Sequence, residues 1–453
     1  MTDGRTPNAE LSAVIAEAGV TYAALARGVR TVAAEAGERL NTGPSAVAYW
    51  VVEGTPNGQT RKFVAEALSR RTRRKVTVAE IVLGCASIGE GMSADPLATA
   101  ADLGRSLMLR RRKVLSAAFA AAAVGLPLTY DHEAVAATLK SADSGSRVGA
   151  EEVAVVRQLT ETFRSADEML GGGHGLLTVT AYLTDTVVPM LTARFPSETV
   201  RRDAFAAAAQ LACLAGWKHH DLGREGLAQQ YYLLGYQFAC ECDPHGHAAW
   251  MMRAMTHQAL DLGHLDPCVE LAEQALRRES GKVDRQTEAL LLITCARAYG
   301  SSGESKKAAQ AVLAAEDALA DTRDPVLPFA AASGPVAATI ASHTGKTLTA
   351  MRNFPAAEQH YRTAMLARTP GTYQRGHALT MVLLGKSVAA QHRYEEAIGL
   401  WNRSLDYLGD VASGRGRKEI TSIKSAIATC RRRGVPGAAQ LDHRATELLQ
   451  AHA

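Results

Sequence analysis

The sequence predicts an all-α fold, in which a small N-terminal helical bundle is followed by an α-solenoid. Of the 453 residues, 47% are hydrophobic but only 5% are aromatic, and this alanine-rich composition favours close-packed helices. A pattern of small residues recurs about every 40 positions in the C-terminal part, which is typical of stacked helical pairs. We divide the chain into the bundle at 1–86, a linker at 87–148 and the repeat region at 149–453.

The N-terminal bundle is predicted from signals that start and stop helices. Thr21 is a helix N-cap, and apolar residues follow it on one helical face at Leu25, Ala26 and Val29. Pro44 stands at the first position of another helix, which Gly54 and Pro56 end. A further helix is expected from about 59 to 70, and a short one from 77 to 81.

These helices carry a resemblance to a known family. Residues 21–26 resemble the first helix, and residues 45–56 the recognition helix, of the phage-repressor (Cro-type, XRE-like) helix-turn-helix family. The connection at 31–41 is longer than the tight turn of that family. Together with the segment FVAEALSRR at 63–71, this expanded form is similar to actinobacterial regulators in which such a domain precedes tetratricopeptide repeats. The resemblance implies that the helix beginning at Ser45 docks in the major groove of double-stranded DNA.

The residues expected to contact DNA lie on that helix, on its approach and at the start of the next helix: Asn41, Thr42, Ser45, Ala46, Tyr49, Arg61 and Lys62. Base edges are read mostly by Arg, Lys, Asn and Gln, and the exposed positions of this helix lack all four. Specificity is therefore expected to depend on DNA shape and on the spacing of two heads in a dimer. The alternative is a degenerate domain that serves dimerisation or protein contact.

The charge distribution favours a polyanion contact in the N-terminal part. The whole chain has 50 Lys and Arg against 46 Asp and Glu, a net charge of +4. The segment from Arg61 to Lys75 holds seven bases and one acid, so it alone carries +6. The rest of the chain is close to neutral. The alternative for the run at 70–75 is a solvated helix face.

Cysteine usage and the chain start predict a cytoplasmic protein. Seven cysteines without framework spacing favour reduced thiols over a disulfide scaffold, and residues 1–10 lack the pattern of a secretory signal. The apolar stretch at 114–128 follows four bases but is shorter than the roughly twenty residues that a membrane span needs. It is expected to be a buried or docking helix, with a membrane or export role as the alternative, and no membrane partner is predicted.

The repeat is defined by small residues expected near helix turns, at Ala228, Cys268, Ala308, Ala357 and Ala397. Twelve positions earlier stand small residues, at Gly216, Thr256, Ala296, Gly345 and Gly385, and four positions later most units have a bulky one, at Tyr232, Val312, Tyr361 and Trp401. This resembles the tetratricopeptide repeat, in which a small residue in one helix lets the next approach and a ring fills the gap. Three prolines at 325, 328 and 335 coincide with a longer inter-repeat connection.

Three motifs resemble sites of other chemistry, but their sequence context favours structural roles. The glycines at 171–175 lack the strand and the Lys-Ser or Lys-Thr of a phosphate-binding loop, so they predict a turn between helices. Residues 342–347 resemble the end of such a loop, but Gly345 occupies a helical repeat position. Cys240, Cys242, His245 and His247 lack zinc-ligand spacing. We find no catalytic constellation and expect no enzyme activity, no metal and no cofactor.

One set of residues points to ligand binding. In tetratricopeptide folds the position after the small residue faces the concave groove, and here it holds Trp217, His257, Arg297, Lys346 and Lys386. Arg253 lies one turn before His257 and extends this basic stripe. The groove is expected to bind a peptide or a small anionic ligand. The alternative is a solvated inner face whose charge keeps the array soluble.

The two parts together predict a DNA-binding transcriptional regulator whose repeat domain senses a ligand, dimerises, or does both. A ligand in the groove would shift the population of solenoid curvatures or dimer geometries, and so change the spacing of two DNA-binding heads. Peptide-sensing regulators of Gram-positive bacteria share this layout, and the resemblance implies a pheromone-type ligand. The alternative is a tetratricopeptide adaptor that binds a protein partner and does not read DNA.

Overall fold

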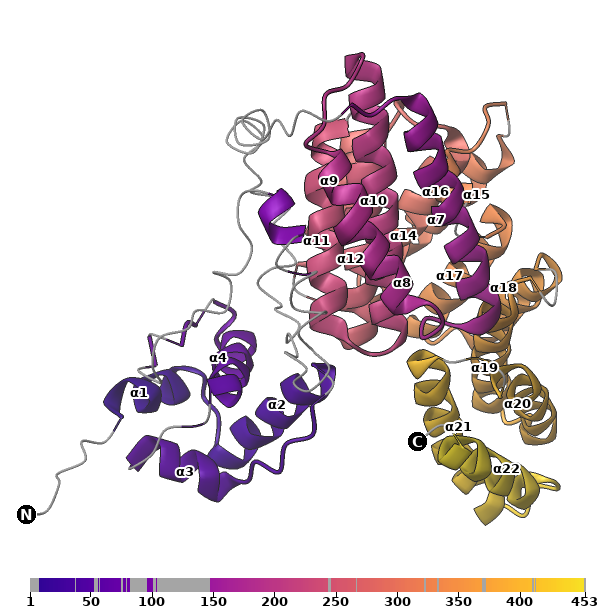
Figure 1. The fold of residues 1–453 in the computed structure, drawn as a ribbon. Coiled ribbons are helices and arrows are strands. Elements are labelled where there is room, and N and C mark those ends of the chain that lie inside the picture. Colours follow the sequence, from indigo (N-terminus) through magenta and orange to yellow (C-terminus); the bar gives the residue numbers. More distant parts are fainter. Residues whose placement is uncertain are drawn as a thin grey trace, which may run out of the picture.

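The structure is a computed structural model that describes residues 8–81, 96–103 and 147–451, apart from short gaps within these ranges. The all-α prediction is confirmed. In the described residues all the secondary-structure elements are helices. The sole β-type contact among them is an isolated bridge between Arg147 and Arg194. Figure 1 shows α1–α4 as one group and the repeat helices as another. The predicted apolar helix at 114–128 lies outside the described residues.

The N-terminal bundle consists of α1 (Ala9–Glu17), α2 (Tyr22–Glu35), α3 (Pro44–Val52) and α4 (Gly58–Thr72). The Thr21 hydroxyl accepts a hydrogen bond from the Ala24 amide at 3.2 Å and so caps α2 as predicted. The core contains Leu25 and Val29 of α2, Trp50 of α3 and Phe63 of α4. The helix expected at 77–81 does not form in the described residues, where Thr77 instead caps a turn by accepting from the Glu80 amide.

The repeat region begins with α7 (Ala150–Leu170), α8 (Leu176–Ala181), a π-helical turn (Tyr182–Val187) and α9 (Val188–Met190). The predicted turn at 171–175 joins α7 to α8. Five helix pairs follow, and each anchor residue of the sequence repeat lies in the second helix of its pair. The pairs are α10 (Glu198–Asp221) with α11 (Glu225–Cys242), α12 (His247–Leu262) with α13 (Cys268–Glu279), α14 (Arg285–Ser301) with α15 (Ser305–Ala320), α17 (Val336–Ala350) with α18 (Phe354–Leu366), and α19 (Gln374–Ala390) with α20 (Tyr394–Leu408).

The remaining helices complete the array. The proline-rich connection after α15 contains the short α16 (Pro328–Ala331), and α21 (Gly414–Arg432) and α22 (Ala438–Ala451) form the C-terminal pair. Residues 342–347 lie within α17, as predicted, so they cannot form a phosphate-binding loop.

Small residues set the close approach of the two helices in a pair. A Cβ at Gly345 would stand 2.6 Å from the Tyr361 ring, and a Cβ at Gly385 would stand 2.4 Å from the Trp401 ring. Gly216 has the same relation to Tyr232, at 2.7 Å. All three rings are fully buried. The predicted pairing of a small residue with a ring therefore sets the packing of three of the five helix pairs.

The array curls so that its late helices return to its first ones. Arg375 of α19 donates to the Asp167 carboxylate of α7 at 2.7 Å, across 208 positions of sequence. The Ser413 hydroxyl, before α21, donates to Asp221 at the end of α10 at 2.9 Å. The helix α7 thus packs against both α10 and α19, and the inner face becomes enclosed.

Among the described residues no single helix has the length and apolar character to cross a membrane. By length and composition alone, α1 and α2 would pass as a pair, but the chain bends by 90° between them.

Candidate functional site

A cavity of about 230 Å³ lies on the inner face of the repeat array. Helices from both ends of the array line it, from α7 and α10 at the start to α19 and α21 at the end. Five of the six predicted ligand-binding residues are in its lining: Trp217, Arg253, His257, Arg297 and Lys346. The sixth, Lys386, is not in the lining, and its ammonium group lies 2.5 Å from the Glu419 carboxylate of α21.

The cavity lining is strongly basic. Seven of its residues are Arg or Lys and three are Asp or Glu. The bases are Arg164, Arg253, Arg297, Lys346, Arg368, Arg375 and Arg415, and the acids are Asp167, Glu168 and Asp261. Because the walls exclude much of the solvent, these charges act on a bound molecule in a medium of low effective dielectric constant.

The acids at the α7 end of the cavity form ion pairs with neighbouring bases. The Asp167 carboxylate accepts from Lys218 at 3.0 Å and from Arg375 at 2.7 Å. Burial raises the pKa of Asp167, but Arg375 and Lys218 outweigh burial and hold that pKa below its ordinary value. This group is a structural ion network, in which Arg375 also lies 3.2 Å from Glu168 and 3.6 Å from Asp221.

At the centre of the cavity, His257 is fixed as a neutral imidazole. Arg297 donates one hydrogen bond to His257 Nδ1 at 2.7 Å and another to the Asp261 carboxylate at 2.9 Å. Since Nδ1 accepts, the ring proton is on Nε2, which faces the Thr294 hydroxyl at 3.2 Å. Burial, together with Arg253 and Arg297, holds the pKa of His257 well below its ordinary value.

A second neutral histidine stands beside the first. The His343 ring centre lies 4.6 Å from that of His257, and its buried Nδ1 has no hydrogen-bond partner among the described residues. Burial and the neighbouring His257 and Arg297 lower its pKa well below the ordinary value. His343 therefore offers an unused polar atom next to the basic residues of the cavity.

Arg253 and Lys346 are cations without counter-charges. The Arg253 guanidinium lies 4.4 Å from the Trp250 ring centre and donates only a long bond, 3.4 Å, to the Leu290 carbonyl. Burial and Arg297 lower the pKa of Arg253 to about 9 and that of Lys346 to about 7. Within the described part of the chain, neither makes an ion pair within 4 Å. Buried charges in proteins are ordinarily paired, which makes the buried Arg253 and the half-buried Lys346 unusual.

Several lining residues were not found from the sequence. Arg164, Arg368, Arg375 and Arg415 lie outside the repeat column that identified the basic stripe. They reach the cavity because the curl brings α7, α19 and α21 together. No spacing rule within one repeat signals such contacts.

The predicted DNA-binding residues differ in exposure. Asn41, Ser45 and Tyr49 are exposed, and Tyr49 keeps 50% of its surface. Thr42 is buried, and its carbonyl accepts from Arg30. Ala46, Arg61 and Lys62 are half-buried, and the Arg61 Nε donates to the Pro56 carbonyl at 2.9 Å.

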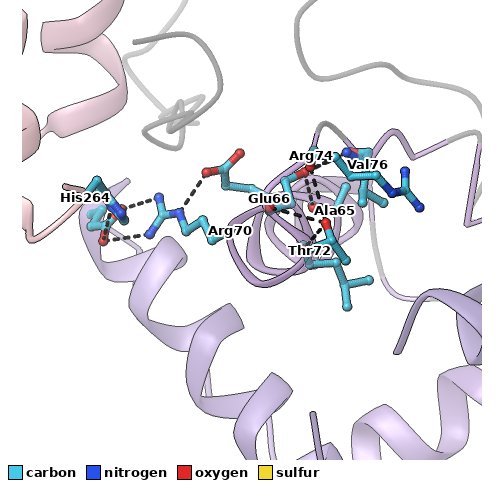
Figure 2. Close-up of polar contacts among 10 residues, drawn as sticks. Ala65, Glu66, Arg70, Thr72, Arg74, Val76 and His264 are labelled. Carbon is cyan, nitrogen blue, oxygen red and sulfur yellow. Dashed lines mark hydrogen bonds and ion pairs between the residues drawn. The ribbon is translucent and has the colours of Figure 1, made fainter. Parts of the chain in front are cut away.

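The basic segment at 61–75 is partly neutralised by acids, two of which, Glu17 and Glu35, are distant from it in sequence. Arg70 contacts Glu35 at 2.6 Å and Glu66 at 2.7 Å. Arg74 contacts Glu17 and Glu80, each at 2.6 Å. Figure 2 shows Arg70 lying between Glu66 and His264 of the repeat region. These ion pairs reduce the positive potential that the segment presents to a polyanion.

The same contact joins the N-terminal bundle to the repeat array. His264, in the connection after α12, lies with its Nε2 4.0 Å from the Glu35 carboxylate at the end of α2. Glu35 thus contacts both the base Arg70 and the repeat region.

No group of three or more His, Cys, Asp or Glu side chains in the described residues is placed to hold a metal ion. Cys240 and Cys242 are free thiols, as are the other described cysteines. His245, part of the rejected zinc motif, lies outside the described residues.

Comparison with known proteins bears on the N-terminal bundle. A family model described as the SP15 N-terminal domain matches residues 11–84. These residues span α1 to α4 and the following turn, so the bundle is similar to that domain. No curated protein matches the chain.

Proposed function

We propose that this protein is a ligand-responsive DNA-binding regulator, in which the repeat cavity binds an anionic ligand and the N-terminal bundle binds double-stranded DNA. The observation that carries the proposal is the pair formed by the buried Arg253 and the half-buried Lys346, neither of which has an ion-pair partner within 4 Å in the described chain. A protein does not gain stability from such charges. Their benefit is therefore expected in binding a peptide or a small anionic molecule.

The DNA-binding part rests on the helix-turn-helix resemblance of residues 21–56 and on surface chemistry. Ser45 and Tyr49 are exposed on α3, and Arg61 and Lys62 stand near the start of α4. In this arrangement α3 enters the major groove and the two bases lie near phosphates. The resemblance also favours a homodimer that acts in the cytoplasm without a cofactor.

The coupling of the two parts follows from the position of the cavity. Its lining joins early helices of the array to late ones, so an anion that neutralises the central cations favours the curled arrangement over a more open one. A ligand shifts such an equilibrium by its difference in affinity for the two states. The curvature of the array in turn sets the distance between two DNA-binding heads in the dimer.

A protein-binding adaptor is the second candidate, and the outer face of α3 favours it. Tyr49 and Val52 are about half exposed, at 50% and 51%, and this face has no Arg, Lys, Asn or Gln. A half-exposed ring beside an aliphatic side chain suits a protein contact better than the reading of base edges.

One experiment separates the two candidates. Full-length protein is incubated with sheared genomic DNA from its source at near-physiological salt, and the retained DNA is sequenced. The test variant is Tyr49→Ala/Arg61→Ala/Lys62→Ala. The control is Arg202→Ala/Arg277→Ala, which removes two exposed bases from the repeat array.

We expect discrete enriched sites with the wild-type protein and the control, and their loss in the test variant. A flat profile for the wild-type protein, with and without an anionic ligand, contradicts DNA reading and favours the adaptor.

A further inference from the structure

The cations at the centre of the cavity outnumber the carboxylates that lie among them. We define the cation cluster as Arg253, Arg297, Lys346 and Arg415. The carboxylate among them is that of Asp261, which lies 2.9 Å from Arg297 and 3.6 Å from Arg415. The electrostatic neighbours of Lys346 are the same groups, Arg297, Asp261 and Arg415, together with Glu419. Glu419 is already paired with Lys386 at 2.5 Å.

This imbalance sets the charge that a ligand must bring. With Lys346 protonated, four cations face one carboxylate, so the cluster has an excess of three positive charges. A single carboxylate in a ligand would leave two of them uncompensated in a buried site, which is costly. A dianion compensates both Arg253 and Lys346, and the remaining excess is spread over Arg297 and Arg415, which share Asp261.

The surroundings of the cluster are aromatic and aliphatic. The Trp250 ring lies under Arg253, and the Trp217 ring lies 5.1 Å from the Arg415 guanidinium. Leu214, Leu379 and Leu383 complete this wall. A ligand in the cavity therefore meets both the charges of the cation cluster and apolar side chains beside them.

The size of the cavity limits the ligand. A volume of about 230 Å³ lies below the roughly 300–1,000 Å³ of ordinary ligand pockets. It suits a small molecule rather than a peptide of several residues.

We propose that the cavity binds a small phosphate monoester, with the phosphate dianion held by Arg253, Arg297 and Lys346 and an aromatic or apolar portion packed against Trp217. Guanidinium groups bind phosphate oxygens through paired, charge-assisted hydrogen bonds, and an ammonium adds a compact third charge. The inference rests on the proposed function, for which it names the class of ligand.

Isothermal titration calorimetry with full-length protein at pH 7 tests the proposal. The probes are phenyl phosphate, which has both a dianion and a ring, benzoate, which has a ring and one charge, and inorganic phosphate, which has no ring. We expect phenyl phosphate to bind at least tenfold more tightly than benzoate and more tightly than inorganic phosphate.

Three single variants locate the binding. Arg253→Gln and Lys346→Met remove cluster charges at similar side-chain volume, and each is expected to weaken phenyl phosphate binding at least tenfold. Lys306→Met is the matched control, because this lysine is exposed on α15 and lies outside the cavity lining. The affinity of this control variant for phenyl phosphate is expected to stay within twofold of wild type. Circular dichroism and thermal melting establish that each variant is folded.

Several results would overturn the proposal. Absence of phenyl phosphate binding to folded wild-type protein at millimolar concentration excludes a phosphate site. Equal or tighter binding of benzoate, with the same dependence on Lys346, rejects the phosphate class but keeps an anion-sensing cavity. A loss in Lys306→Met as large as in Lys346→Met shows non-specific attraction and rejects the site. Since no DNA is present, these results are independent of the genomic selection that tests DNA binding.

Discussion

At the scale of single residues, the charge state of Lys346 links stability to binding. Burial, followed by Arg297 and Arg415, lowers its pKa to about 7 against the attraction of Asp261 and Glu419. The unfolded chain keeps the ordinary lysine pKa of about 10.4. Between these values the unfolded state binds more protons than the folded state, so this residue makes the free energy of unfolding rise with pH from about 7 to about 10.

Replacing this lysine should stabilise the protein while removing a ligand contact. We expect Lys346→Met to raise the free energy of unfolding at pH 7 by about 1–4 kcal/mol, because an apolar side chain avoids the desolvation of a buried charge. Urea denaturation at pH 7 and pH 9 measures this, and the gain over wild type should shrink at pH 9. A variant less stable than wild type at pH 7 would contradict this account.

The same titration predicts how ligand affinity depends on pH. A bound dianion favours the protonated form of Lys346, so binding takes up a proton near and above pH 7. Phenyl phosphate affinity should fall as the pH rises above about 7, by up to tenfold per pH unit. Calorimetry in two buffers of different ionisation enthalpy detects the proton. Lys346→Met should show neither the proton uptake nor the decline.

At the scale of helices, contact between a glycine and a ring controls the approach of the two helices in three of the five pairs. Gly345 lets α17 approach the Tyr361 ring of α18 so closely that a methyl group would lie 2.6 Å from it. Because the ring is fully buried among packed side chains, it cannot move away without displacing its neighbours.

We therefore expect Gly345→Ala to destabilise the protein by about 1–3 kcal/mol through overpacking. The control is Gly399→Ala in α20, an exposed helical glycine where an added methyl group would meet nothing within 4 Å. It should stabilise by about 0.4–1 kcal/mol, because alanine restricts the unfolded chain. Chemical denaturation compares the two, and an equal effect of both would contradict the close-contact explanation.

At the scale of the whole molecule, a buried ion network closes the curl of the array. Asp167 of α7 contacts Lys218 of α10 and Arg375 of α19. The helices α10 and α19 are more than 150 positions apart in sequence. The network nevertheless joins them around the Asp167 carboxylate. The network thereby holds together the two ends of the cavity lining.

Removing the shared charge should destabilise the closed array. We expect Asp167→Asn to cost about 3–5 kcal/mol, because Lys218 and Arg375 remain buried without full compensation. The control Asp317→Asn, in an exposed pair with Arg285, should change stability by at most about 1 kcal/mol. Urea denaturation gives both values, and hydrogen exchange should show lost protection in α7 and α19. Unchanged exchange there would contradict a closing role.

Acid should weaken the same network. The folded-state pKa of Asp167 is lowered, so its contribution to stability is present above the unfolded pKa of about 3.9 and is lost as the pH falls through the folded value. Asp167→Asn should show less of this loss than wild type in an acid titration followed by circular dichroism.

Local sequence was sufficient to predict the all-α fold, the spacing of the repeat and the common face of most residues of the basic stripe. Caps such as Thr21 and columns such as Gly345 with Tyr361 act over a few residues or one repeat, so their spacing is visible in the chain. Five of the six stripe residues line the cavity for this reason. Helical periodicity determines the helix face on which a side chain lies, and residues on the same face remain together in the folded array.

The charge balance of the site depended instead on long-range packing. Arg375 reaches Asp167 across 208 positions, Lys386 turns to Glu419 of the next helix pair, and Arg74 of the basic segment is paired with Glu17. Such contacts follow from the curvature of the array and the folding of the bundle. Spacing along the chain contains no signal for them, because ion pairs form between any two charges that the fold brings within a few ångströms.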